Sequence, residues 1–201
     1  MPCTHKFADY LNLDHLDFEP TTLIVGTFNP GWENINNNAQ WFYGRTRNNY
    51  FWDVLPRLYE NRNLRQENHI EWKQFCSRNS IALTDLLQSI NDANPENPNH
   101  ITAIQNFKDT EIANVFNDFI PTDIIEILQN NPTINKVYLT RQLGSAFWDN
   151  YWNIIVQHCQ NNNISTQALL TPSASARFQM NGGQLRDFIY NSWEPVWHPI
   201  I

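Results

Sequence analysis

Residues 23–31 read Leu-Ile-Val-Gly-Thr-Phe-Asn-Pro-Gly. The first five form a short apolar run, and the Asn-Pro-Gly that closes the stretch is a strong turn signal. The stretch therefore predicts a buried strand over residues 23–27 that ends in a sharp turn. Taken alone, Asn29, Pro30 and Gly31 are explained by the turn, because these residue types suit turns.

Three more apolar runs predict strands like the first one. They do not alternate with polar residues, and continuous runs are typical of a parallel sheet covered on both faces. Their ranges are 80–84, 136–140 and 167–171.

Amphipathic stretches between these runs predict helices, with Pro56 expected to break or kink the first of them. Residues 91–99 are expected to form a polar loop. Strands that alternate with helices predict an α/β fold, a three-layer α/β/α sandwich around a central, mainly parallel four-stranded sheet. We expect residues 1–201 to form one domain. The helical stretches are 49–59, 68–78, 122–129, 145–160 and 183–193.

The composition indicates a folded protein with an acidic balance. Hydrophobic residues make up 41% and aromatic residues 13% of the 201 residues, which excludes a disordered chain. Charged residues make up only 16%, and asparagine runs such as residues 36–38 are interpreted as solvated loops. The net charge of -7 argues against nucleic-acid binding. A local basic groove could still act on an acidic body, because salt screens exposed charges beyond roughly 8 Å.

The three cysteines, Cys3, Cys76 and Cys159, are far apart and have no metal-ligand spacing. We expect them to be reduced, buried and inert, and we expect no metal and no cofactor. The sequence has neither a signal-peptide pattern nor a stretch of about 20 apolar residues, so a soluble cytoplasmic protein without membrane contact is expected.

Two loops follow predicted strands, residues 27–31 and residues 171–177. Ligands of open parallel sheets bind beyond the carboxyl ends of the strands, so both loops are expected to face one cleft. Gly26 and Gly31 would let the backbone approach a ligand closely. Asn29 carries both a hydrogen-bond donor and an acceptor.

Residues 42–52 combine aromatic side chains, two arginines and two asparagines directly before a predicted helix. Aromatic rings can stack on bases and arginines can hold phosphate. The simpler interpretation is a helix N-cap at Asn48 or Asn49 followed by core aromatics. For Phe51 and Trp52 the helical spacing favours the core.

Three segments carry a resemblance to a known family: the first segment is residues 26–31, the second is residues 42–52 and the third is residues 171–177. Together and in this order, they resemble the uracil-DNA glycosylase superfamily. Residues 26–31 are similar to the Gly-x-Asn-Pro-Gly motif of its mismatch-specific uracil/thymine branch. Residues 46–52 are similar to the His-Pro-x-Asn-x-Phe-Trp segment shared with its hypoxanthine branch, and residues 171–177 to its Asn-Pro-Ser-x-x-x-Arg loop. The resemblance implies a monomeric DNA-repair enzyme that flips a deaminated or mispaired base out of the stack and hydrolyses its N-glycosidic bond.

The resemblance also assigns roles to residues. Asn29 would position the attacking water, and Asn49 is the second catalytic candidate. The expected substrate-binding residues are Gly26, Thr27, Phe28, Pro30, Gly31, Tyr43 and Ser173. The expected DNA-binding residues are Arg45, Arg47, Ser175 and Arg177.

Departures from the motifs keep two alternatives open. Thr46 and Arg47 replace the His-Pro pair, and the small Ser175 stands where the wedge that fills the gap left by the flipped base is expected. One alternative is a DNA-binding module that has lost catalysis. The other is a nucleoside or nucleotide hydrolase that acts on free substrate. Which base is excised, and from single- or double-stranded DNA, depends on the shape of the pocket.

Overall fold

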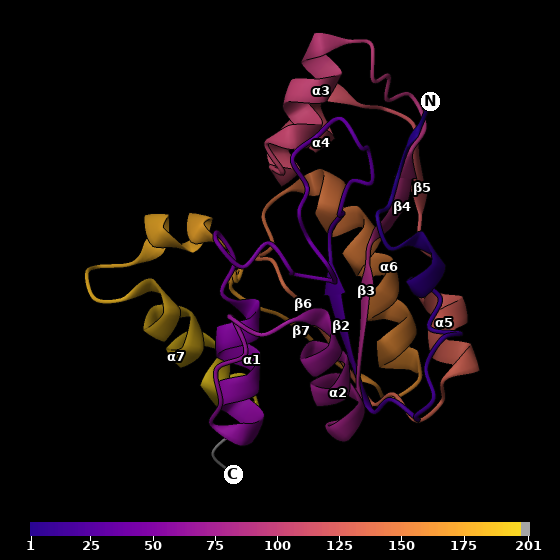
Figure 1. The fold of residues 1–201 in the computed structure, drawn as a ribbon. Helices are drawn as coiled ribbons and strands as arrows, with labels where there is room; N and C mark the ends of the chain where they lie inside the picture. The colour runs from indigo at the N-terminus through magenta and orange to yellow at the C-terminus, as the bar shows by residue number, and fades with distance from the viewer. Residues whose placement is uncertain (198–201) are drawn as a thin grey trace.

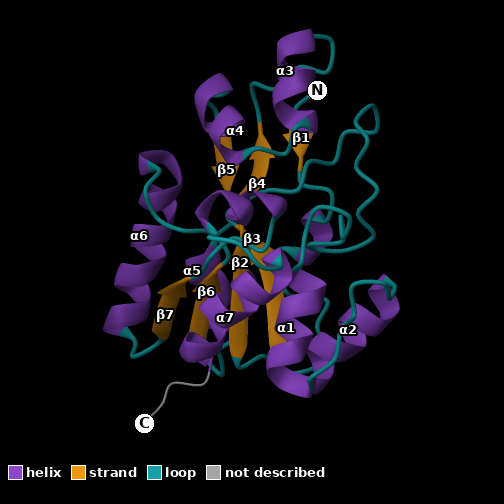
Figure 2. Cartoon of the chain, turned by 90° about the vertical axis from the view of Figure 1, so that its left-hand side faces the viewer, coloured by secondary structure: helices purple, strands orange, loops and turns teal. Residues whose placement is uncertain are grey.

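The computed structural model describes residues 1–197 (Figure 1). Its longer helices surround a central sheet, and a smaller sheet lies beyond one end of that sheet (Figure 2). In chain order the elements are β1 (Cys3–Thr4), η1 (Ala8–Tyr10), β2 (Thr22–Gly26), α1 (Phe51–Glu60), α2 (His69–Arg78), β3 (Ile81–Asp85), β4 (Leu87–Ile90), α3 (Pro98–Gln105), α4 (Asp109–Val115), β5 (Phe119–Pro121), α5 (Ile124–Asn130), β6 (Lys136–Leu139), α6 (Ala146–Asn161), β7 (Ser165–Ala168), η2 (Ala174–Gln179) and α7 (Leu185–Trp197).

The central sheet has the strand order β3-β2-β6-β7, and every neighbouring pair is parallel. Ile24 in β2 lies opposite Leu83 in β3 and Tyr138 in β6. The predicted four-stranded parallel sheet is confirmed, and the strands begin and end within one to three residues of the expected positions.

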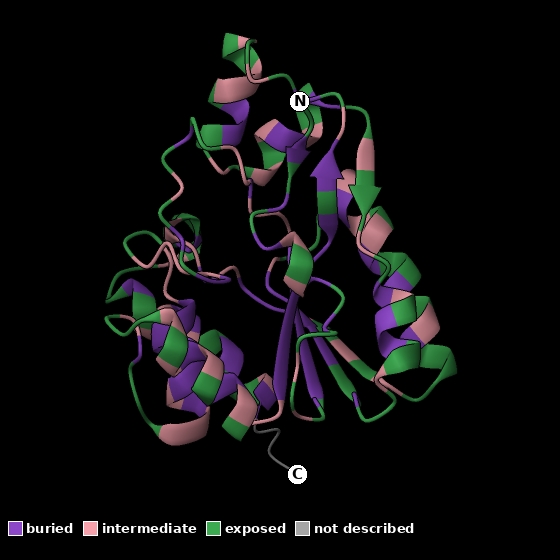
Figure 3. Ribbon diagram, turned by 45° about the vertical axis from the view of Figure 1, so that its right-hand side comes forward, coloured by how far each residue is buried: buried purple, intermediate pink, exposed green. Residues whose placement is uncertain are grey.

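The alternation of side chains along β2 divides the core between the two faces of the sheet. Ile24 packs with the buried residues of α1, α2 and α7, whereas Leu23 and Val25 pack with those of α5 and α6. Both faces are therefore covered, which explains why β2 and β3 are buried along their whole length (Figure 3). The predicted three-layer arrangement is confirmed.

Three features differ from the sequence-based expectations. The expected strand at residues 167–171 is β7 and ends at Ala168. The loop expected over residues 91–99 gives way at Pro98 to α3. The small antiparallel sheet β1-β4-β5 was not predicted, because its strands are two to four residues long and too short for a clear periodic pattern.

Pro56 lies inside α1 without ending the helix. Proline has no N–H to donate to the carbonyl four residues earlier, which belongs to Trp52. The backbone N–H of Leu64 donates to that carbonyl instead, at 2.8 Å. The break, one of the two outcomes expected at Pro56, is therefore wrong, because α1 continues to Glu60. The kink, the other expected outcome, stays a prediction.

The order of the strands defines where a ligand can bind. From β2 the chain passes to β3 on one side, and β6 then pairs with the other side of β2. The loops that follow β2 and β6 therefore diverge at their carboxyl ends, which is the topological switch point where open α/β sheets bind ligands. None of the helices described within residues 1–197 is long and apolar enough to cross a membrane.

Candidate active site

A group of polar side chains gathers at the carboxyl ends of β2, β3 and β6, where the switch point lies. We call it the strand-end cluster. Its members are His5, Thr27, Tyr43, Asp85, Asp109, Thr140 and Arg141.

A buried pair of His5 and Asp85 forms the centre of the strand-end cluster. Nε2 of His5 lies 2.7 Å from Oδ2 of Asp85, and the two residues are only 3% and 6% exposed. The backbone N–H of Phe7 donates to Nδ1 of His5 at 3.0 Å, so Nδ1 accepts and Nε2 carries the hydrogen that points to Asp85. Within residues 1–197 the second carboxylate oxygen, Oδ1, accepts no hydrogen bond.

Gly26 permits this arrangement. A Cβ at Gly26 would lie 2.1 Å from Oδ1 of Asp85 and 2.9 Å from the hydroxyl of Tyr43. The group that approaches Gly26 closely in this structure is the Asp85 carboxylate, and the approach of a ligand stays a prediction. At Gly31 a Cβ would meet the backbone oxygen of Thr4 at 2.8 Å, so this glycine serves packing against the N-terminal segment.

Tyr43 connects the second segment to the sheet. Its hydroxyl lies 2.9 Å from the Oγ1 of Thr140, and its ring stacks on Phe51 with 3.8 Å between centroids. Burial raises the pKa of Tyr43 well above its usual value, and the charge of Asp85 raises it further. The phenol therefore stays neutral and acts as a hydrogen-bonding group.

Thr27, Asp109 and Arg141 extend the strand-end cluster across the switch point. Asp109 accepts a hydrogen bond from Thr27 Oγ1 at 2.8 Å and from Arg141 Nη1 at 3.1 Å. Burial raises the pKa of Asp109, while Arg141 acts in the opposite direction. Burial lowers the pKa of Arg141, because for both residues burial disfavours the charged form.

Asn29 is held in a defined orientation beside the strand-end cluster. Its Oδ1 accepts a hydrogen bond from Nδ2 of Asn37 at 2.6 Å. Oδ1 of Asn37 accepts from the backbone of Ala39, which fixes Asn37 with its amide hydrogens toward Asn29. Within residues 1–197 the Nδ2 of Asn29 donates no hydrogen bond. The backbone of Asn29 and Pro30 pairs with Lys6 and His5, and this contact places the loop next to the Asp85 pair.

One expectation for these loops needs correction. The run at residues 36–38 was expected to be a solvated loop, yet Asn37 is partly buried and bonds to Asn29. The expectation that the loops 27–31 and 171–177 face one cleft stays a prediction. Within residues 1–197 their backbones pair with different segments.

The third segment pairs with the second segment. Asn49 and Ser173 form an antiparallel bridge, flanked by hydrogen bonds from Tyr50 N to Pro172 O and from Ala174 N to Asn48 O. The Asn49 side chain accepts from Phe51 N at 2.8 Å. The N-cap of α1 is Tyr50, so the cap expected at Asn48 or Asn49 lies one residue further along the chain. The hydroxyl of Ser173 lies 2.5 Å from that of Ser175.

The expected DNA-binding arginines lie in different surroundings. Arg45 stacks over the ring of Phe107 at 3.3 Å, and burial lowers its pKa to about 10. Arg47 is exposed, and its backbone oxygen accepts from Arg65. Arg177 is exposed and lines a cavity together with Arg65 and Arg186.

Sequence reasoning missed His5, Asp85, Asp109 and Asn37. Asp85 directly follows the predicted strand 80–84, so the rule that ligands bind at strand ends could have identified it. His5 carries no local signal, because only tertiary structure brings it to a residue 80 positions away. Within residues 1–197 no group of three or more His, Cys, Asp or Glu side chains could hold a metal ion.

No protein-family model and no curated protein sequence matches the chain. One solved structure is similar, the solution NMR structure of a "putative Uracil DNA glycosylase" from Methanosarcina acetivorans. The two chains superimpose with a TM-score of 0.57 at 16% identity, over 90% of this chain and 91% of that one. At this identity the likeness establishes the fold, so the chain has the α/β fold of that Methanosarcina protein. In this chain the strand-end cluster lies at the switch point of the sheet.

Proposed function

We propose that this protein is a DNA glycosylase that hydrolyses the N-glycosidic bond of a deaminated or mispaired base such as uracil or hypoxanthine. One observation carries the proposal. The loop with Asn29, which resembles the glycosylase motif, lies beside a buried carboxylate at the switch point of the sheet. The shared fold with the Methanosarcina protein supports the same class of activity.

In the proposed reaction, water adds to C1′ of the flipped nucleotide and the bond from C1′ to the base breaks. The bonding electrons leave with the base, one hydrogen of the water ends on the base, and the hydroxyl stays on the sugar. Asn29 orients the water, since an amide offers hydrogen bonds in fixed directions. The contact with Asn37 keeps that amide in place before substrate binds.

Asp85 is the group proposed to contact the base. Its Oδ1 has no hydrogen-bond partner within residues 1–197, so it can accept from a base N–H. Uracil and hypoxanthine each carry a ring N–H next to a carbonyl group. Because Asp85 is only 6% exposed, a base reaches it only when neighbouring side chains move aside. Thr27, Phe28 and Tyr43 are the proposed lining of that space.

The proposal is tested with single-stranded and mismatched oligonucleotides that carry uracil, hypoxanthine or an undamaged base. We expect the wild type to produce abasic sites from at least one damaged substrate. Asn29→Ala is expected to lower the rate roughly 100-fold, since water is no longer positioned. Asn49→Ala tests the second catalytic candidate. Asp85→Asn is expected to change the relative rates among bases, because an amide can still accept from His5. Asn38→Ala, at an exposed neighbour, is the matched control.

Folded wild-type protein that yields no abasic product from any of these substrates would refute the proposed activity. A DNA-binding module without catalysis is then the second candidate. It is favoured by the side-chain oxygens of Asn29 and Asn49, which both accept hydrogen bonds within the protein. A mobility shift with a duplex that contains an abasic site distinguishes it, since tight binding without cleavage supports such a module.

A further inference from the structure

A cavity of about 610 Å³ is lined by the loop after α1, the end of η2 and the start of α7, and it shares no lining residue with the strand-end cluster. We call it the arginine pocket. Its lining includes Tyr50, Arg65, Arg177, Arg186 and residues 182–185. Its size falls in the range of about 300–1,000 Å³ that is common for ligand sites. The three arginines come from separate segments of the chain, so only the fold brings them together.

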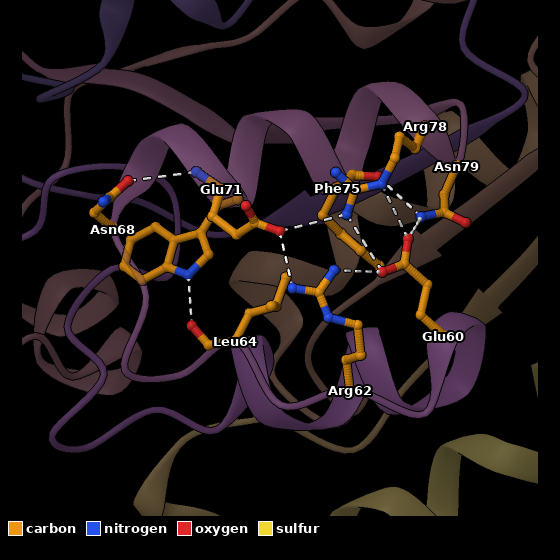
Figure 4. Close-up of polar contacts among 9 residues, drawn as sticks. Glu60, Arg62, Leu64, Asn68, Glu71, Phe75, Arg78 and Asn79 are labelled. Atoms are coloured by element: carbon orange, nitrogen blue, oxygen red, sulfur yellow. Dashed lines mark hydrogen bonds and ion pairs between the residues drawn. The ribbon is translucent and has the colours of Figure 1, made fainter.

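Most other arginines of the protein are neutralised by carboxylates. Figure 4 shows Arg62 and Arg78 between Glu60 and Glu71, with nitrogen–oxygen distances of 3.0 to 3.5 Å. Arg57 and Arg141 likewise have carboxylate partners within 3.4 Å. In an acidic protein, this pairing is what an ordinary surface arginine is expected to show.

The arginines of the pocket depart from this pattern. Arg65 donates to the backbone oxygens of Thr46 and Arg47 and lies over the ring of Tyr50, and none of these groups carries a negative charge. Within residues 1–197 Arg177 forms no ion pair. Among the described residues Arg186 reaches only the carboxylate of Asp187, at 3.8 Å, and that carboxylate lies closer to Arg57, at 3.0 Å. The pocket therefore retains positive charge that the protein itself does not neutralise.

The shape of the pocket suits a phosphate group. Guanidinium groups bind phosphate oxygens through paired N–H donors. Gly182 and Gly183 have positive φ, and a Cβ at either position would meet nothing within 4 Å, so no side chain fills this side. The first turn of α7 adds backbone N–H groups that lack acceptors within the helix.

The position of the pocket connects it to the proposed substrate. Tyr50, which lines it, donates from its backbone N to Pro172 in the third segment. Arg177 closes the same segment. We propose that the arginine pocket binds phosphodiester groups of the DNA strand that carries the target base. The choice of DNA as the source of the phosphate rests on the proposed function, whereas the preference for phosphate rests on the arginines alone.

The test measures fluorescence anisotropy of a short labelled single-stranded oligonucleotide without damaged bases, titrated with full-length protein at several salt concentrations. The double variant Arg177→Gln/Arg186→Gln changes two exposed side chains, so the fold is expected to persist, and circular dichroism checks this. We expect roughly a tenfold or greater loss of affinity per arginine. The slope of log affinity against log salt should fall by about 1.4, or roughly 0.7 for each lost phosphate contact. Arg62→Gln/Arg78→Gln removes the same two positive charges outside the pocket and is the matched control.

Unchanged affinity and slope in the folded double variant would overturn the inference. A second titration uses inorganic phosphate as competitor. If phosphate at concentrations comparable with the oligonucleotide displaces it from the wild type, the pocket is a site for free phosphate and the DNA assignment is wrong. The probe carries no damaged base, so the binding test does not depend on excision. If the protein excises no base, the inference about the pocket still stands or falls by the titration. If the oligonucleotide binds without the pocket, the proposed excision is not affected.

Discussion

At the scale of single residues, Gly26, His5 and Asp85 together hold a buried carboxylate at the carboxyl end of the sheet. Gly26 leaves room for the Asp85 carboxylate, and His5 holds one of its oxygens. A buried carboxylate is costly unless it is paired, so the three residues depend on one another.

Gly26→Ala is expected to destabilise the protein by about 1–3 kcal/mol, because the new methyl group would overlap Asp85 and Tyr43. Urea unfolding followed by tryptophan fluorescence measures the change. Ser165→Ala, on the exposed edge strand β7, is the control. A stability equal to that of the wild type would mean that the carboxylate can move away at no cost.

His5→Ala is expected to cost about 1–3 kcal/mol, since it removes the N–H that donates to the buried carboxylate of Asp85. Thr4→Ala changes the exposed neighbour at the end of β1 and should have little effect. Both are measured by urea unfolding. If the double variant His5→Ala/Asp85→Ala is no more stable than His5→Ala alone, the uncompensated charge is not the cause.

At the scale of elements, side-chain caps determine where several helices begin. Asn68 accepts from the backbone of Ile70 at 2.9 Å and of Glu71 at 3.4 Å, and Asn97 and Asp123 act similarly at α3 and α5. Asn68 and Asn97 thus serve the backbone at helix starts, as short polar side chains do.

Asn68→Ala is expected to lower the free energy of unfolding by about 1 kcal/mol, because two N–H groups of α2 lose their acceptor. Chemical denaturation gives the value. Asn36→Ala, at an exposed asparagine outside any helix, is the control. Equal losses for the two variants would show that the cap does not act specifically.

Asp109, the first residue of α4, is expected to make stability depend on pH. Burial raises its pKa above the ordinary value of 3.8. A raised carboxyl pKa means that the folded state binds the proton more tightly than the unfolded state. The stability it contributes is therefore complete below pH 3.8 and is lost as pH rises through the raised value. Unfolding of the wild type and Asp109→Asn across the acid range should give a wild-type advantage that falls with pH. An advantage that rises with pH would contradict the assignment.

At the scale of the whole molecule, two cores on opposite faces of the sheet enclose all three cysteines. Cys76 packs in the core with α1 and α7, and Cys3 and Cys159 pack in the other. Burial raises the pKa of Cys3 and Cys159 to about 11 and that of Cys76 still further. The thiols stay protonated, which agrees with the expectation of buried, inert cysteines.

A thiol reagent such as DTNB is therefore expected to label no cysteine of the native protein at pH 8 on the time scale on which it labels the denatured chain. In urea all three should react, because only the thiolate attacks and unfolding restores its ordinary pKa. Rapid labelling of one native thiol would reveal local opening of the core that contains it. Cysteine-to-serine variants identify the reactive position.

The sequence by itself determined the four strands, the helices α1, α2, α5, α6 and α7, and the loops that carry Asn29, Asn49 and Ser173, but it did not indicate α3 and α4. Apolar periodicity and turn residues report local burial, and local burial defines elements. The sequence could not reveal the small sheet, because its strands are too short to show a periodic pattern. It also could not reveal that α1 continues through Pro56.

Only the tertiary structure decided which distant side chains meet. His5 forms a hydrogen bond with Asp85, and Asn37 forms one with Asn29. Arg65, Arg177 and Arg186 line one pocket. The physical reason is that these contacts follow from strand order and from the directions in which loops leave the sheet. Those are properties of the packed whole, and no window of neighbouring residues contains them.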